Sequence, residues 1–355
     1  MSQLELIAPI LSDSQVKVIL DPTNSACPFH NYIGNREAVE IALDLAFSAF
    51  SNRTTLLETG EQVCVRECNK RIALLGPPGT GKTLFAKTFT QVLELPFIET
   101  DAARLTNAAK LFEFINSVLI EHEIPLVALR EVGGISHYLV PPSVLFIDEV
   151  HGLRGATQDS LLKMLEGNDG RLILSSSVLD CKRMCVIVAT TDKGKLRPAF
   201  KRRFIKITLK RHTTEELAQI VRNAFSWNFK DCMAVAERSP NAGEALELAK
   251  SVLSSSNRTH KSITATIPII AERLGIDDDG INSVAIAVLE LLQGEDNGLS
   301  RKAICAALSI EEDEFVNDCL PFLMANNKHQ AYITISNRHR ISEAGKKFLK
   351  QRGKK

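Results

Sequence analysis

The sequence lacks the features that mark secreted and membrane proteins. No apolar run approaches the ~18 residues that a membrane-spanning helix needs, and the N-terminus lacks the basic segment and apolar core of a secretory signal. It also lacks an excess of either charge, because the formal net charge is +1. We therefore expect a cytoplasmic protein that crosses no membrane, and any contact with a nucleic acid must come from a local basic patch.

The eight cysteines fit a reducing compartment, where they stay thiols rather than form disulfides. Two pairs share a C-x₃-C spacing, Cys64/Cys68 and Cys181/Cys185, so a four-thiolate zinc site is one interpretation. The spacing is a loose pattern and no turn residues flank it. Buried or incidental thiols are the interpretation that we favour.

At 355 residues the chain exceeds what a single core usually supports, so two or three domains are expected. After a lead-in over 1–27, helical and extended patterns alternate over 28–210, which is typical of an α/β fold with a parallel sheet covered by helices. A polar connection is expected at 51–69. The predicted helices are 33–50, 82–94, 104–121 and 156–166, and the predicted strands are 71–75, 96–99, 144–148, 185–190 and 204–208.

A phosphate-binding loop follows the apolar run 71–75 and precedes a helical pattern. It has the sequence motif G-x-x-x-x-G-K-[ST], in which glycines let backbone N–H groups point inward at phosphate oxygens. Lys82 would reach the β- and γ-phosphates of ATP, and Thr83 would ligate Mg²⁺. The loop residues are Gly76, Pro77, Pro78, Gly79, Thr80, Gly81, Lys82 and Thr83.

Two carboxylates follow the apolar run 144–147 directly. A fully buried parallel strand has such a run, and its carboxyl end is where α/β sheets place ligands. We therefore predict Asp148 as the partner of Mg²⁺ and Glu149 as the base for the attacking water.

A third apolar strand, 186–189, ends in two hydroxyl residues. A polar side chain at that strand end can orient the lytic water, and Thr191 is the first choice and Thr190 the second. A cluster of cations follows at a proline turn and includes Arg202 and Arg203. These two would reach a neighbouring subunit's nucleotide as arginine fingers, which implies a ring; a solvated basic loop is the alternative.

The remainder of the chain divides into a helical domain over 211–274 and a winged helix-turn-helix over 275–355. Thr213 and Glu216 form a capping box before a helix at 214–226. Later helices are expected at 282–293 and 299–308, and Ser309 with Glu312 would cap a third that runs to about 325. An alternating segment, 331–335, and 340–342 would form the hairpin of the wing.

Basic residues gather in the wing, where Arg338 and Arg340 are the predicted DNA contacts. The third helix opens with four acids at 311–314, which would repel a phosphate backbone. The wing should therefore bind DNA through phosphates, without sequence preference. We expect a frayed, solvated terminus over 350–355.

Together these motifs resemble those of an AAA+ ATPase, and in detail the RuvB family of Holliday-junction branch-migration motors, over most of residues 28–350. The segment 29–34 is similar to that family's adenine-binding segment, which implies that role for Ile33 and Gly34. The segments 263–277, 297–300 and 338–342 are similar to its passage from lid to winged helix and to its basic wing. The resemblance implies ATP and Mg²⁺ as cofactors, DNA as a partner, a homo-oligomeric ring, expected as a hexamer, and an adaptor protein.

Three departures distinguish the chain from that family. Asn241 stands where the family has its sensor-2 arginine, unless Arg238 supplies the cation. The segment 171–184 is shorter than the family's partner-docking hairpin, so the adaptor's identity stays open. Extra sequence at 124–141, around Gly133 and Gly134, predicts another hairpin.

Three functions agree with these residues. The first is an ATP-driven ring that translocates duplex DNA or drives branch migration. The second is an AAA+ protein remodeller or loader in which the winged helix only tethers a substrate or partner. The third is an ATP-switched DNA-binding protein that hydrolyses ATP poorly, which Asn241 would permit.

Overall fold

The computed structural model describes residues 13–49, 54–56, 62–64, 68–153, 155–166, 170–191, 196–277, 280–324, 331–335 and 338–352. The chain forms two compact units. The first contains the chain up to Lys210, and the second begins at Arg211 and also takes in the short segment 78–80.

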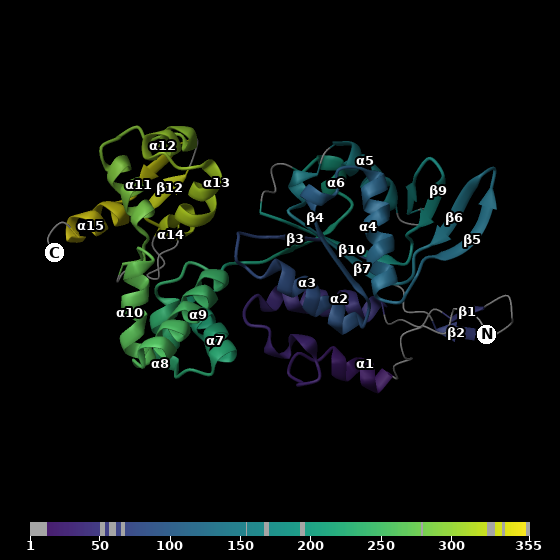
Figure 1. Ribbon diagram of the computed structural model, residues 1–355, viewed down its shortest axis with the longest axis horizontal. Coiled ribbons are helices and arrows are strands. Elements are labelled where there is room, and N and C mark those ends of the chain that lie inside the picture. Colours follow the sequence, from purple (N-terminus) through teal and green to yellow (C-terminus); the bar gives the residue numbers. More distant parts are fainter. Residues whose placement is uncertain are drawn as a thin grey trace. The chain divides into compact units, whose positions relative to one another are not determined.

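A parallel sheet of five strands forms the centre of the first unit, with the order β11-β3-β10-β7-β4 (Figure 1). The strands β3 and β10 are buried along their whole length, as are the first five residues of β7, which explains their continuous apolar runs. The α/β fold class that the sequence predicts is confirmed. The bounds are β3 Arg71–Leu75, β4 Phe97–Asp101, β7 Ser143–Asp148, β10 Met184–Thr190 and β11 Ile205–Thr208.

Helices cover both faces of this sheet (Figure 1). On one face, α2 (Arg36–Ala49) and α3 (Lys82–Leu93) bury their apolar side chains against alternate residues of the strands. On the other face lie α4 (Ala108–Glu121), α5 (Gly155–Met164) and the short α6 (Pro198–Lys201). Because the crossovers place helices on both sides, the sheet leaves its carboxyl edge as the place for a ligand.

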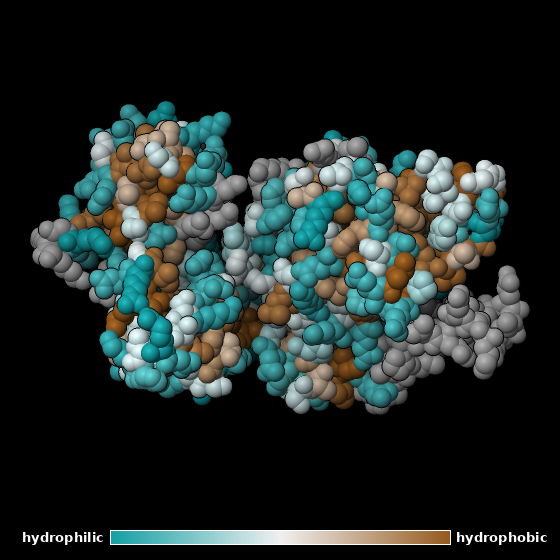
Figure 2. Space-filling model, viewed as in Figure 1, coloured by the Kyte–Doolittle hydropathy of each residue, from teal (hydrophilic) through white to brown (hydrophobic). Residues whose placement is uncertain are grey.

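A second sheet of four strands, in the order β5-β6-β9-β8, extends the first unit. β5 (Val127–Val132) and β6 (Ile135–Leu139) form the predicted extra hairpin, and both turn glycines have positive φ, 60° at Gly133 and 77° at Gly134. β8 (Arg171–Ile173) and β9 (Ser177–Asp180) form a second hairpin, and β9 pairs with β6 in parallel. Figure 2 shows apolar surface over this sheet, where Leu129, Val132 and Ile173 are exposed.

The N-terminal part departs from the prediction in two places. The lead-in contains a helix, α1 (Asp13–Ile19), and a 3₁₀ turn, η1 (Pro28–Asn31), precedes α2. The predicted polar connection at 51–69 contains a short antiparallel pair, β1 (Thr54–Leu56) with β2 (Gln62–Cys64). Strands of three residues are too short to show the alternation of apolar and polar residues from which a strand is predicted.

Four helices build the first part of the second unit around one apolar cluster. They are α7 (Thr214–Phe225), α8 (Phe229–Ala236), α9 (Ala242–Thr259) and α10 (Ile263–Arg273). The capping box of Thr213 and Glu216 is present at the start of α7. The other three helices are capped by the side chains of Asn228, Asn241 and Ser262. Each of these side chains accepts a hydrogen bond from a backbone N–H of the first helical turn.

The C-terminal part of this unit has its own core. Its hairpin, β12 (Ile333–Ile335) with β13 (His339–Ile341), is antiparallel, and a bridge joins Leu299 to His339. Residues 336 and 337, between the two strands, lie outside the described residues. The helices are α11 Ser283–Gln293, α12 Arg301–Leu308, α13 Glu312–Glu314, a π-helical turn Phe315–Cys319 and α14 Leu320–Met324, followed after the hairpin by α15 Glu343–Arg352.

Two predictions for this part are wrong. Ser309 does not cap the third helix: it ends α12 in the left-handed conformation with φ 55°, and Glu311 precedes α13. The frayed terminus predicted over 350–355 is wrong for Lys350 and Arg352, which are exposed but form the last turn of α15, and Arg352 pairs with Asp277. Residues 353–355 lie outside the described residues. The ring of Phe348 packs against Tyr332 at 4.8 Å between centroids, and this contact anchors the helix.

Candidate nucleotide-binding site

The phosphate loop joins β3 to the N-terminus of α3, so backbone N–H groups and the positive end of the helix face the same space. Gly79 and Gly81 have φ of 70° and 80°, which only glycine adopts without strain. The ammonium of Lys82 donates to the carbonyls of Gly76 at 3.1 Å and Pro77 at 3.0 Å. Burial lowers the pKa of Lys82, and the charges of Glu149 and Asp148 oppose that shift.

Two oxygen-bearing side chains meet beside the loop. The hydroxyl of Thr83 donates to Oδ2 of Asp148 at 3.3 Å, and Oδ1 of Asp148 accepts the backbone N–H of Glu149 at 2.9 Å. Hydroxyl and carboxylate oxygens are the ligands that Mg²⁺ prefers beside substrate phosphates. The donor set therefore fits Mg²⁺.

Glu149 projects from the end of β7 in a left-handed conformation, with φ 44°. Its Oε2 accepts the hydroxyl of Thr191 at 3.2 Å and lies 3.0 Å from Nδ1 of His151. The same ring nitrogen lies 3.0 Å from Oγ1 of Thr190. The two hydroxyls at the end of β10 therefore differ: Thr191 contacts Glu149 directly, whereas buried Thr190 holds His151.

His151 is the site residue to which sequence reasoning gave no role. It lies two positions after Glu149 in the 3₁₀ turn Val150–Gly152, which turns its ring back toward the carboxylate. The only sequence signal is its place directly behind the acidic strand end. That place becomes informative once β10 is known to lie beside β7.

The predicted adenine segment packs against the helix that follows the loop. Phe29 and Tyr32 contact Phe85 of α3, with ring centroids 5.3 Å and 5.6 Å apart. The next residue, Ile33, is half-buried, and Gly34 after it has a φ of 76°. Ile33 and Gly34 are thus held near α3, because the aromatic cluster fixes the backbone directly before them.

Arg202 and Arg203 lie at the end of α6, and both are exposed. Nη2 of Arg203 lies 3.7 Å from Oε1 of Glu166, a long contact between half-exposed groups. Such a pair contributes little to stability, so Arg203 can leave it at small cost. Behind them Phe200 and Phe204 pack at 4.9 Å between centroids and fix the base of the turn.

Asn241 has a structural role in the helical part. Its side chain accepts the backbone N–H of Glu244 at 3.0 Å and so caps α9. The guanidinium of Arg238 donates to the carbonyl of Ala234, one turn back in α8, at 3.0 Å. Asn241 therefore supplies a cap and no cation, and Arg238 uses one of its five N–H donors on its own helix.

The two wing arginines lie on β13 and directly before it, and both are exposed. Arg338 donates to the carbonyl of Gly298 at 3.2 Å, and Arg340 donates to that of Asn297 at 3.3 Å. Each uses one donor there and keeps others for a phosphate, since a guanidinium has five N–H donors. His339 between them is buried, and burial lowers its pKa.

Three of the four thiols considered for zinc, those of Cys68, Cys181 and Cys185, lie near the buried side chain of Arg71. The thiols of Cys68 and Cys185 are hydrogen-bonded, and this bond lowers the pKa of Cys68 whereas burial raises that of Cys185. Arg71 donates to the carbonyl of Met184 at 2.9 Å beside them. In the part of the chain that the structure describes, no group of three candidate metal ligands occurs, and the side chain of Cys64 lies outside that part.

Comparisons with known proteins agree with this site. The family "ATPase family associated with various cellular activities (AAA)" matches residues 72–211. The Holliday junction branch migration complex subunit RuvB of Nitratiruptor sp. is 30% identical over 289 residues, which cover 75% of this chain and 79% of that protein. The subunit of the same name from Campylobacter hominis is 26% identical, covering 88% and 86%.

The Thermotoga maritima RuvB Holliday junction branch migration motor is similar in structure, with a TM-score of 0.67 at 22% identity, covering 90% of this chain and 95% of that one. This likeness establishes the fold. None of the helices among the described residues has the length and apolar character to cross a membrane.

Proposed function

Because this chain belongs to the RuvB family of AAA+ ATPases, we propose that it is an ATP-driven DNA motor that acts on branched duplex DNA in recombination and repair. The observation that carries the proposal is the meeting of Lys82, Thr83, Asp148, Glu149 and Thr191 at the carboxyl edge of one sheet. A basic wing in the same chain supplies the contact with DNA.

Each residue has a defined task in ATP hydrolysis. The loop N–H groups and Lys82 would hold the phosphates, while Thr83 and Asp148 would hold Mg²⁺, which neutralises charge on the phosphate oxygens when it is bound. Glu149 accepts the proton of the attacking water, which needs a base within hydrogen-bond reach. Thr191 and His151 fix the direction of that carboxylate.

The exposed position of Arg202 and Arg203 supports a ring in which each subunit completes its neighbour's site. We take this cytoplasmic ring to be a hexamer, and its adaptor protein would dock on the second sheet of the first unit. The exposed apolar side chains of Leu129, Val132 and Ile173 on that sheet support such docking.

The test is the dependence of ATP turnover on DNA structure. ATPase rates are measured without DNA, with linear duplex and with a four-way junction of equal length, and strand exchange on the junction is followed in parallel. We expect junction DNA to give the largest stimulation, and the Lys82→Ala protein to show none. A rate that no DNA alters, in a protein that folds and binds ATP, would rule out the motor.

One observation favours a second function, an ATP-switched DNA-binding protein. Asn241 caps a helix and brings no positive charge to the nucleotide, and Arg238 is bound to the carbonyl of Ala234. A switch of this kind would bind DNA differently with and without ATP while hydrolysing it slowly. DNA affinity that changes with ATP, in the absence of strand exchange, would favour it over the motor.

A further inference from the structure

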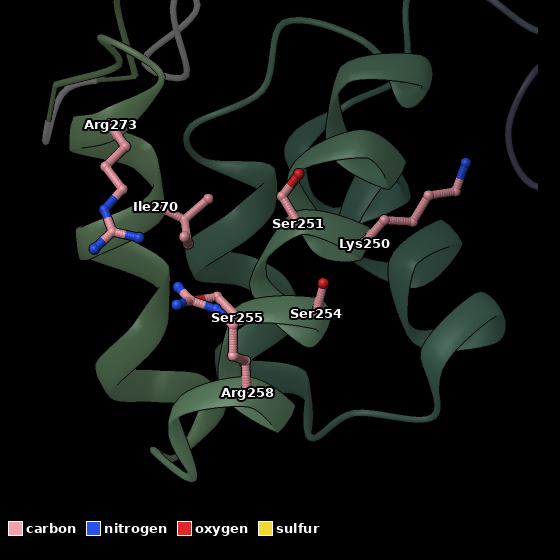
Figure 3. Close-up of a pocket in the computed structure, with 7 residues that line it drawn as sticks. All are labelled: Lys250, Ser251, Ser254, Ser255, Arg258, Ile270 and Arg273. Carbon is pink, nitrogen blue, oxygen red and sulfur yellow. The ribbon is translucent and has the colours of Figure 1, made fainter.

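A gap between α9 and α10 has a basic, hydroxyl-rich lining (Figure 3). Its volume is about 440 Å³, and none of its lining residues is acidic. Charge of one sign around a recess attracts a ligand of the opposite sign. The lining residues are Lys250, Ser251, Ser254, Ser255, Arg258, Ile270 and Arg273.

The gap follows from the sequence of the two helices. On α9 the polar positions 251, 254, 255 and 258 recur at helical spacing, so they form one stripe. The apolar positions of α9 lie on another face, where Leu248, Ala249 and Val252 join the core. Serines are too small to fill the space opposite α10, so a recess remains above buried Ser255 and Ile270.

Two guanidinium groups point into this recess from different helices. Arg258 extends from the last turn of α9 and Arg273 from the last residue of α10, and Figure 3 shows both side chains directed toward the opening beside Ile270. Lys250, in contrast, extends away from them, and its ammonium lies 3.0 Å from Oε1 of Glu247. The lysine has a carboxylate partner on its own helix, whereas the two arginines converge.

Neither Arg258 nor Arg273 has a carboxylate partner within the described part of the chain. Other arginines of the molecule do have one: Arg197 pairs with Asp159 and Arg301 with Glu312. Both side chains are exposed, so their N–H donors are accessible to an anion from solution. Planar guanidinium groups match the oxygens of a phosphate in paired hydrogen bonds.

We propose that Arg258 and Arg273 form a clamp for a phosphate group, with the hydroxyls of Ser251, Ser254 and Ser255 as further donors. The phosphate belongs either to a DNA backbone or to a free polyphosphate. The DNA source rests on the proposed function, since it adds a second phosphate contact to that of the wing. The polyphosphate source does not depend on it.

The experiment compares the full-length Arg258→Ala/Arg273→Ala protein with Lys250→Ala, which removes a charge from the same rim without touching the clamp. Affinity for a labelled duplex is measured by fluorescence anisotropy across a salt series. If DNA supplies the phosphate, the double variant loses about tenfold in affinity and its log–log salt slope flattens by up to ~2, because each phosphate contact contributes about 0.9. Lys250→Ala should match the wild type.

Binding of inorganic pyrophosphate forms the second arm, measured by calorimetry in a Lys82→Ala background that disables the phosphate loop. Loss of pyrophosphate binding in the double variant with unchanged DNA affinity assigns the clamp to a free polyphosphate. An Arg258→Lys/Arg273→Lys protein, which keeps charge but not paired hydrogen bonds, should bind with intermediate affinity and confirms that any loss is not misfolding.

The proposal is overturned if neither ligand distinguishes the double variant from the wild type, or if Lys250→Ala causes an equal loss, which would be a general effect of charge. Failure of the proposed function is a separate result. In that case DNA fails to stimulate ATP turnover in the wild type, while the pyrophosphate arm still decides whether the clamp exists.

Discussion

Gly298→Ala should detach the wing, because this glycine lies where no side chain fits. Its φ is 68°, and a Cβ built there would lie 2.5 Å from the carbonyl oxygen of His339 and 2.5 Å from Cγ of Arg340. The neighbouring Leu299 exchanges two backbone hydrogen bonds with His339, at 3.0 Å and 2.8 Å. The methyl group must therefore push apart the pairing that holds β13 against the loop.

The size of the effect follows from three losses. A left-handed alanine costs about 1 kcal/mol relative to glycine, and each of the two backbone hydrogen bonds contributes about 1 kcal/mol. The pairing of Leu299 with His339 should thus lose about 3 kcal/mol, which makes its opening more than ~100-fold more frequent. Arg338 and Arg340 bond to the carbonyls of Gly298 and Asn297, so they would lose their fixed positions as well.

Amide hydrogen exchange at Leu299 and His339 measures this opening directly. The matched control is Gly294→Ala, because Gly294 has an ordinary φ of −83° and the nearest atom to its built Cβ is a carbonyl oxygen at 3.8 Å. Exchange in the control should stay near the wild-type rate. Unchanged protection of these amides in Gly298→Ala would refute the reasoning. Faster exchange with unaltered DNA affinity would show that the wing does not contact DNA.

Glu149→Gln keeps the shape of the side chain but not the base, so we expect ATP binding to persist and turnover to fall by ~10²–10⁴ in a steady-state assay; wild-type turnover would move the role elsewhere. Thr83→Ala removes the hydroxyl that contacts the carboxylate of Asp148, so the Mg²⁺ concentration for half-maximal ATPase activity should rise. An unchanged Mg²⁺ requirement would exclude Thr83 as a ligand. Arg202→Ala/Arg203→Ala protein should bind ATP but hydrolyse it ~10³–10⁵-fold more slowly, and added Lys82→Ala protein should partly restore the rate; if no mixing ratio does, the arginines do not act between subunits.

The sequence predicts those parts of the site whose geometry is local. Lys82 and Thr83 follow the loop within one helical turn, and the conformation of the loop alone decides where both side chains lie. The apolar runs before Asp148 and Thr190 similarly identify buried strands, because only a strand covered on both faces needs so many consecutive apolar residues.

Features that depend on distant pairings were not predictable in this way. The contact of His151 with both Glu149 and Thr190 requires β10 beside β7 in a particular register and a left-handed Glu149. Ser309 shows the converse error: its spacing from Glu312 fits a capping box, but the packing of α12 places it in a left-handed helix end. A local pattern can indicate a capping residue, but tertiary packing determines whether that residue lies at the start or the end of a helix.

The role of Asn241 bears on the choice between a DNA motor and an ATP-switched DNA-binding protein. Charge that develops on the transferring phosphate must be neutralised by cations close to it, and here the side chain of Asn241 caps α9 instead. Lys82 remains as the cation of the subunit's own loop, and in the proposed ring Arg202 and Arg203 of a neighbour would add further positive charge. If Asn241 stands where the proposed motor would otherwise have a cation, hydrolysis should depend more strongly on Arg202 and Arg203, because both are exposed and available to a neighbouring subunit. Assembly of the proposed ring would then control the rate of hydrolysis.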